Sequence, residues 1–124
     1  MTQYKKTVVV GASPNPARYA YRAAHMLTEY SHPIIPLSIK RGELAGETIL
    51  DLREKPFIPD VDTLTLYIGP QHYEQWMDYL LDLSPRRIIF NPGTENPDFM
   101  AQAEERGIEV VEGCTLVMLQ TGTY

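Results

Sequence analysis

The feature that most constrains the fold is an alternation of short apolar runs with longer segments whose apolar residues recur at helical spacing. Residues 7–10 form a continuous β-branched run that ends at Gly11. A run without polar alternation suits a strand buried on both faces of a parallel sheet. Similar runs at residues 34–39, 63–68, 87–90 and 108–111 indicate four more strands. The pattern predicts an α/β fold, a single Rossmann-like domain with a five-stranded, mainly parallel sheet and helices on both faces.

The segments between and after these runs predict helices at residues 17–30, 71–83, 97–106 and 115–120. Asn96 is a good N-cap with proline after it, and Gly107 is a good helix end. Residues 40–62 are polar and interrupted by glycine and proline, which predicts an irregular connection with a short strand or turn near residues 47–52. The stripe of the first helix that faces the sheet is predicted to consist of Tyr19, Ala23, Met26, Leu27 and Tyr30.

Size and charge narrow the class of protein. The 124 residues suit one domain, spanning residues 1–124. Eleven Lys and Arg against sixteen Asp and Glu give a net charge of −5, which argues against a nucleic-acid surface. No apolar stretch resembles a signal peptide or a membrane span, so we expect a cytoplasmic protein. The one cysteine, Cys114, excludes an internal disulfide and a cysteine-built metal site.

The turn after the first strand is a candidate phosphate site. Ligands of parallel α/β sheets bind where the strands end, and here the sequence reads GASPNP between a strand and a helix. Of the glycines of a dinucleotide-binding loop only Gly11 is present, with Ala12 and Ser13 following, which disfavours ordinary NAD binding. The Ser13 hydroxyl, the free N–H groups of the helix and Arg18 could hold a phosphate. The alternative is that these residues form only a tight turn with a capping serine and surface arginines.

The end of the second strand carries Lys40 and Arg41, with no acidic residue before Glu43. NAD sites place an acid here to bind the ribose hydroxyls. Two cations instead suit a phosphorylated ribose, as in coenzyme A or NADP. Two solvated charges in a loop are the alternative.

No set of residues predicts catalysis. The three histidines, His25, His32 and His72, are scattered and have no nucleophile linked to them. Cys114 follows the last strand, where a thiol could approach a ligand, although a small buried cysteine is the commoner case. The loop from Asn91 to Glu95, including Gly93, offers polar contacts but only one acid. We therefore expect a binding protein without metal or catalytic residues.

The opening motif VVVGASPNP, continued by Arg18, Tyr19 and the Tyr21-Arg22 pair, resembles the small CoA-binding domain family. That family is similar to the Rossmann-type amino-terminal domain of the succinyl-CoA synthetase α subunit and of ADP-forming acyl-CoA synthetases. The stretches at residues 67–70, 89–95 and 112–114 look like the later strand ends of the family. The synthetases carry their catalytic phosphohistidine and ATP-grasp parts in other domains, which this sequence does not contain.

The resemblance implies a Rossmann-like fold and affinity for coenzyme A. It places Gly11, Ser13 and Arg18 at the phosphates and Lys40 near the nucleotide end. It also implies that the pantetheine arm is flanked by Ile68, Gly69 and Pro70. The full set of expected cofactor-binding residues is Gly11, Ala12, Ser13, Asn15, Arg18, Tyr19, Lys40, Arg41, Ile68, Gly69, Pro70, Asn91 and Gly93.

Three functions remain open at this point. The first is a non-catalytic coenzyme A protein, acting as a carrier, sensor or subunit of an acyl-CoA system. The second is an NADP-dependent oxidoreductase, and the third is a protein-interaction domain without a ligand. A sheet of this kind leaves an edge strand or a helix free for self-association, so a homodimer is a further expectation.

Overall fold

The apolar run at residues 7–10 forms the central strand β1 (Thr7–Val10), and all four of its residues are buried. In the computed structural model, which describes residues 4–124, β1 pairs in parallel with β2 (Ile34–Ser38) and with β6 (Thr63–Leu66). The remaining strands are β5 (Leu50–Asp51), β7 (Arg87–Phe90) and β8 (Glu109–Glu112). The sheet has the order β5-β2-β1-β6-β7-β8, and every neighbouring pair is parallel. The predicted parallel α/β fold is confirmed, with six strands instead of five.

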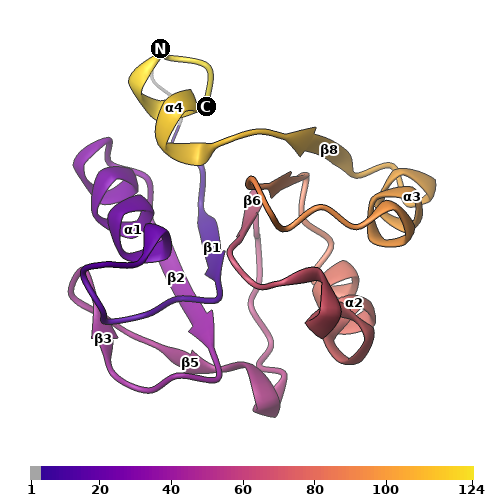
Figure 1. The fold of residues 1–124 in the computed structure, drawn as a ribbon, viewed down its shortest axis with the longest axis horizontal. Coiled ribbons are helices and arrows are strands. Elements are labelled where there is room, and N and C mark those ends of the chain that lie inside the picture. Colours follow the sequence, from indigo (N-terminus) through magenta and orange to yellow (C-terminus); the bar gives the residue numbers. More distant parts are fainter. Residues whose placement is uncertain (1–3) are drawn as a thin grey trace.

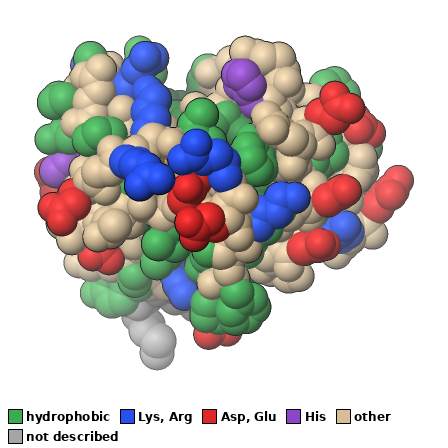
Figure 2. Space-filling view, turned by 90° about the horizontal axis from the view of Figure 1, so that it is seen from below, with side chains coloured by type: hydrophobic (Ala, Val, Ile, Leu, Met, Phe, Trp, Pro, Cys, Tyr) green, Lys and Arg blue, Asp and Glu red, His purple; other side chains and the backbone are tan. Residues whose placement is uncertain are grey.

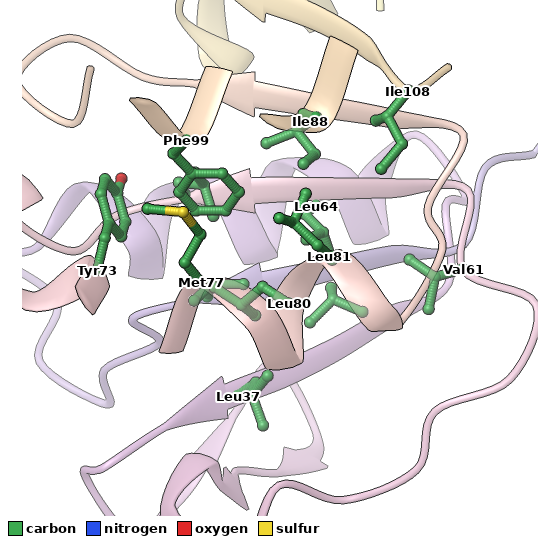
Figure 3. Packing of buried hydrophobic residues seen from close by; sticks show 14 of the residues in the cluster. Leu37, Val61, Leu64, Tyr73, Met77, Leu80, Leu81, Ile88, Phe99 and Ile108 are labelled. Carbon is green, nitrogen blue, oxygen red and sulfur yellow. The ribbon is translucent and has the colours of Figure 1, made fainter. Parts of the chain in front are cut away.

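Two pairs of helices cover the two faces of the sheet (Figure 1). One face is covered by α1 (Tyr19–Glu29) and α4 (Thr115–Gln120), whose Leu27 and Leu119 pack in one apolar cluster. The other face is covered by α2 (Tyr73–Asp82) and α3 (Pro97–Glu105). Figure 3 shows Leu81 of α2 packed toward Leu64 of the sheet, and Met77 of α2 beside Phe99 of α3. Helices on both faces explain why the strands lack polar alternation.

The sixth strand comes from the segment that we expected to be irregular. Residues 40–62 contain a hairpin of β3 (Glu43–Leu44) and β4 (Glu47–Thr48), then β5 and the 3-10 helix η1 (Leu52–Glu54). β5 pairs with β2 through only two positions, Leu37 with Leu50 and Ser38 with Asp51. Strands of two residues are too short to produce a detectable alternation, so the sequence indicated a strand or turn here without its place in the sheet.

Pro36 lies within β2, although proline cannot donate to a strand ladder. The hydrogen bonds on either side of it explain how it fits. Thr7 N–H donates to the carbonyl oxygen of Pro33, and Gly11 N–H donates to that of Leu37, so the odd-numbered residues of β2 face β1. Pro36 therefore faces the other way, before the start of the short pairing with β5. No ladder donor is needed at this position.

The sheet-facing stripe of α1 differs from the prediction at both ends. Ala20, Ala23, Ala24 and Leu27 are buried, whereas the side chains of Tyr19 and Tyr30 are 66% and 45% exposed. Tyr30 lies beyond the last residue of the helix. The three alanines let α1 pack close to the sheet, and this leaves no room for a tyrosine beneath its first turn. Tyr19 instead lies over the edge where the strands end.

The two ends predicted for the helix at residues 97–106 agree with the structure. The Oδ1 atom of Asn96 accepts a hydrogen bond of 2.9 Å from Phe99 N–H, which is the expected N-cap of α3. Gly107 follows α3 with a φ of +78°, a left-handed conformation that favours glycine. α2 is preceded by a 3-10 turn, η2 (Pro70–His72). Within residues 4–124 no helix combines the length and apolarity needed to cross a membrane.

The direction of chain progression reverses at β1. From β1 the chain moves to β2 and β5 on one side, and it then returns to β6, β7 and β8 on the other side. The loops after β1 and β6 consequently leave the sheet in opposite directions and open a crevice between them. The carboxyl ends of β1 and β6 are thus the place where this fold offers a binding site.

Candidate functional site

A pocket of about 440 Å³ opens across the carboxyl ends of β2, β1, β6 and β7, and we call it the main pocket. Its walls are Gly11, Ser13, Arg18, Tyr19, Ala20, Ser38, Ile39, Lys40, Tyr67, Ile68, Gly69, His72, Pro92, Gly93 and Thr94. Figure 2 shows several Lys and Arg side chains in the middle of the face seen from below, with Asp and Glu side chains beside them. The pocket itself is lined by two cations, Arg18 and Lys40, in a chain whose net charge is −5.

The floor of the main pocket is the turn after β1. Gly11 has a φ of +89°, and its N–H donates a hydrogen bond of 2.8 Å to the Leu37 carbonyl of β2. On the other side, Tyr67 N–H donates to the Val10 carbonyl at 2.8 Å. The ends of three strands are thereby held together at one point. Ala12, which follows Gly11, is fully buried beneath the turn and does not line the pocket.

The rest of the turn is shaped by two side chains that bond to the backbone. Ser13 is 2% exposed, and its Oγ accepts a hydrogen bond of 3.1 Å from Asn15 N–H. The Oδ1 atom of Asn15 accepts one of 3.0 Å from Ala17 N–H. Such turns deliver the chain to the start of α1 in a fixed orientation. Asn15 therefore builds the turn from outside the pocket, whereas Ser13 keeps its hydroxyl proton free to donate toward the pocket that it lines.

The amino end of α1 points its free donors at the same pocket. Arg18 is the N-cap residue, and its side chain makes no capping hydrogen bond. Tyr19 and Ala20, the first two residues of the helix, line the pocket together with the exposed Arg18. Free N–H groups and the positive end of the helix dipole attract anions, and a guanidinium adds forked donors. The combination is suited to a phosphate.

The two cations after β2 diverge. Ser38 is buried, and its Oγ accepts a hydrogen bond of 3.1 Å from Lys40 N–H, while the Lys40 side chain lines the main pocket. Arg41 is not part of the pocket wall. It lies on the side of β5, where hydrogen bonds from Arg53 and, more weakly, the charge of Arg41 lower the pKa of Asp51. Of the predicted pair, only Lys40 faces the pocket.

The end of β6 contributes Tyr67, Ile68 and Gly69 to the wall. The hydroxyl of Tyr67 is buried close to the hydroxyls of Thr65 and Thr115, but among residues 4–124 no group meets hydrogen-bond geometry with it. Burial raises its pKa to about 12, so the hydroxyl keeps its proton at neutral pH. Pro70 lies in η2 and lines a separate depression, whereas His72, two residues on, reaches the main pocket.

Asn91 directly follows β7, and its side chain holds neighbouring segments together. Its Nδ2 donates to Thr65 Oγ1 at 2.8 Å and to the Leu66 carbonyl at 2.9 Å, and its Oδ1 accepts from Thr115 N–H at 2.9 Å. The amide joins the ends of β6 and β7 to the first residue of α4. It lines a smaller cavity beside the main pocket. The Gly93 N–H, in the main pocket wall, is bound by Glu95 Oε1 at 2.9 Å.

The structure brings together most of the expected residues. Eight of them line the main pocket: Gly11, Ser13, Arg18, Tyr19, Lys40, Ile68, Gly69 and Gly93. The other five, Ala12, Asn15, Arg41, Pro70 and Asn91, lie outside it. The wall also contains Tyr67, which we did not expect. Its position directly after an apolar run was the available signal, because side chains at strand ends project over the edge of the sheet.

The wall of the main pocket combines cationic, hydrogen-bonding and apolar groups. Its walls contain no carboxylate and no thiol. Within residues 4–124 there is also no group of three or more His, Cys, Asp or Glu side chains that could hold a metal ion. What the walls do contain is a helix amino end, two cations and apolar surface from Ile39 and Ile68. These features match an elongated ligand with anionic and apolar parts.

Comparison with known proteins gives a family and a set of similar folds. A family model described as "CoA binding domain" matches residues 5–120. A crystal structure of an uncharacterized protein is 50% identical, with a TM-score of 0.95, and the match covers 99% of this chain and 100% of that one. A protein from Thermus thermophilus is 24% identical, with a TM-score of 0.82, covering 98% and 91%. A hypothetical protein from Pyrococcus horikoshii is 23% identical, with the same TM-score, covering 96% and 84%. Among curated proteins no sequence matches.

Proposed function

Because the chain belongs to the CoA-binding domain family, we propose that it binds coenzyme A in the main pocket. The observation that carries this proposal is the order of groups along the pocket. Lys40 lies at the β2 end, the turn at Gly11 and the amino end of α1 lie in the middle, and apolar Ile68 lies at the β6 end. Coenzyme A has the same order of parts: a phosphorylated ribose, a pyrophosphate and an uncharged pantetheine arm.

In this arrangement each end of the pocket holds a different part of the ligand. The Lys40 ammonium, which is exposed, pairs with the 3′-phosphate of the ribose. The pyrophosphate lies against the Ser13 hydroxyl, the Arg18 guanidinium and the first N–H groups of α1. The pantetheine arm passes over Ile68 and Gly69 toward the loop at Gly93. A Cβ atom at Gly69 would stand 2.5 Å from Gln71 Oε1, so the glycine lets the Gln71 side chain lie against this stretch.

We further propose a binding role, as a carrier, sensor or subunit, over a catalytic one. The pocket has one histidine, His72, and its wall contains no carboxylate or thiol to pair with it. Because its pKa is raised to about 12, the phenol of Tyr67 stays protonated at neutral pH and cannot act as a general base. A thioester of coenzyme A incubated with the protein is therefore expected to remain intact over the time in which it binds.

Calorimetric titration with coenzyme A, dephospho-CoA and NADPH tests the proposal. We expect saturable binding of coenzyme A and binding of dephospho-CoA that is about fivefold weaker, the effect of one exposed ion pair. Both affinities are expected to fall as salt is added. If coenzyme A does not saturate the protein, the proposal is wrong. If NADPH binds more tightly than coenzyme A, the phosphorylated ribose is recognised but the rest of the ligand has been misassigned.

A further inference from the structure

A second cavity, of about 220 Å³, lies beside the main pocket, and we call it the side pocket. It is formed where β7 and β8 end, between the first residue of α1 and the start of α4. Its lining residues are Tyr19, Tyr67, Asn91, Pro92, Cys114 and Leu116. Nothing in the ligand arrangement proposed above occupies it.

The side pocket adjoins the main pocket. Tyr19, Tyr67 and Pro92 line both cavities. Tyr19 comes from α1, Tyr67 from the end of β6 and Pro92 from the loop after β7, so side chains of three segments form the boundary between the two cavities. The end of a ligand lying along the main pocket is therefore next to the side pocket.

The order of the strands determines which end of a ligand would enter. From Lys40 after β2 the sheet passes through β1, β6 and β7 to Cys114 after β8. Four strand intervals separate the two ends, a distance of about 19 Å. If the nucleotide is held at Lys40 and the pyrophosphate at Arg18, the opposite end of coenzyme A, which carries its sulfur, is directed toward β7 and β8.

The lining of the side pocket selects an uncharged occupant. None of its six residues is an acid, a lysine or an arginine. The polar atoms of Asn91 are already used, since Nδ2 donates to Thr65 and Leu66 and Oδ1 accepts from Thr115. The remaining surface consists of the rings of Tyr19, Tyr67 and Pro92, the Leu116 side chain and the Cys114 thiol, all of them uncharged groups. A carboxylate placed here would lose its hydration and meet no cationic side chain.

From these observations we infer that the side pocket receives the acyl group of a short, uncharged acyl thioester of coenzyme A. The inference rests on the proposed function, because it needs the nucleotide end to lie at Lys40. Its consequence is that the protein distinguishes acylated from free coenzyme A. Each methylene group that enters the apolar cavity should tighten binding about fourfold, until the cavity is full.

Titration of the wild-type protein with a series of ligands tests the inference. Coenzyme A, acetyl-CoA, butyryl-CoA and succinyl-CoA have the same nucleotide. We expect affinity to rise from coenzyme A to butyryl-CoA and to be lower for succinyl-CoA than for butyryl-CoA. Equal affinities across the series, with coenzyme A bound, would overturn the inference and leave the proposed function standing. Absence of binding by every member would overturn both.

A pair of variants on α4 locates the effect. Leu116→Trp fills the side pocket, so butyryl-CoA should bind this variant no more tightly than coenzyme A does. Val117→Trp is the matched control, because Val117 is the next residue, is 52% exposed and does not line the cavity. It should keep the preference for butyryl-CoA. An unchanged preference in folded Leu116→Trp would contradict the inference.

Alkylation of the thiol gives a measurement that does not depend on a variant. Cys114 is the one cysteine of the chain and lines the side pocket. Butyryl-CoA at saturation should slow its reaction with iodoacetamide more strongly than coenzyme A at saturation does. If the two ligands protect Cys114 equally, the acyl group is not in the side pocket.

Discussion

Gly11 and Ile68 approach so closely that a Cβ atom on the glycine would lie 2.8 Å from Cγ2 of the isoleucine. The same atom would lie 2.9 Å from the carbonyl carbon and oxygen of Tyr67. Gly11 also has a φ of +89°, a left-handed conformation that side chains rarely adopt. The turn after β1 is thus pressed against the end of β6, and both segments line the main pocket. The glycine is required by the closeness of two strands as much as by any ligand.

Gly11→Ala is therefore expected to destabilise the protein by about 3 kcal/mol in urea unfolding, because steric overlap with backbone is added to the cost of a positive φ. Gly46→Ala is the matched control. Gly46 has a similar φ of +83°, but a Cβ atom there would meet nothing within 4 Å. It should cost only about 1 kcal/mol. Equal losses in the two variants would show that the contact with Ile68 and Tyr67 contributes nothing.

Asn91→Ala should lower the free energy of unfolding by about 3 kcal/mol, because it removes three buried hydrogen bonds and leaves Thr115 N–H without its acceptor. The comparison is Asn96→Ala, which removes one N-cap hydrogen bond at a partly buried site and should cost about 1 kcal/mol. Urea unfolding of both variants measures the difference. A loss for Asn91→Ala no larger than that for Asn96→Ala would contradict its role in joining β6, β7 and α4.

The sequence was sufficient where the determinants are local. The position of Gly11 between a strand and a helix follows from neighbouring residues, and so does the cap at Asn96. The sequence placed the core of the sheet correctly, because strands buried on both faces produce continuous apolar runs. It indicated a short strand or turn near residues 47–52 but did not place a sixth strand in the sheet, because β5 pairs through only two residues.

The directions of the side chains at the carboxyl edge of the sheet could not be predicted from the sequence. Lys40 and Arg41 are adjacent in sequence, but only Lys40 lines the pocket. Asn91 was expected at the ligand, yet its amide is bound by Thr65, Leu66 and Thr115. These partners come from two other segments, and their approach depends on the register of β6 with β7 and on the place of α4. No pattern within a window of residues contains that information.

The divergence of Lys40 and Arg41 gives a matched pair of variants. Lys40→Ala is expected to weaken coenzyme A about fivefold and to leave dephospho-CoA almost unaffected, because the ammonium pairs with the 3′-phosphate. Arg41→Ala should change neither affinity by more than twofold, since Arg41 does not line the pocket. Calorimetric titration of both variants with both ligands measures this. A larger effect from Arg41 than from Lys40 would reverse the assignment of the nucleotide end.

His32 makes the stability of the protein depend on pH. Its Nδ1 accepts a hydrogen bond of 2.9 Å from Lys5 N–H, so the imidazole must be unprotonated at that nitrogen. Burial, followed by the charges of Lys5 and Arg87, lowers the pKa of His32 below its ordinary value of 6.5. Between the lowered value and 6.5 the unfolded chain therefore binds a proton that the folded protein does not bind. The free energy of unfolding should fall as the pH is lowered through this range.

His32→Asn keeps an acceptor for Lys5 N–H but cannot take up a proton, so it should flatten the pH dependence below pH 6.5. The slope that it removes should not exceed about 1.4 kcal/mol per pH unit, the contribution of one proton. His72→Asn is the control, because His72 is exposed and accepts no backbone hydrogen bond within the described part of the chain. Urea unfolding between pH 5 and 8 measures all three proteins. If His32→Asn keeps the wild-type slope, the acid sensitivity arises elsewhere in the molecule.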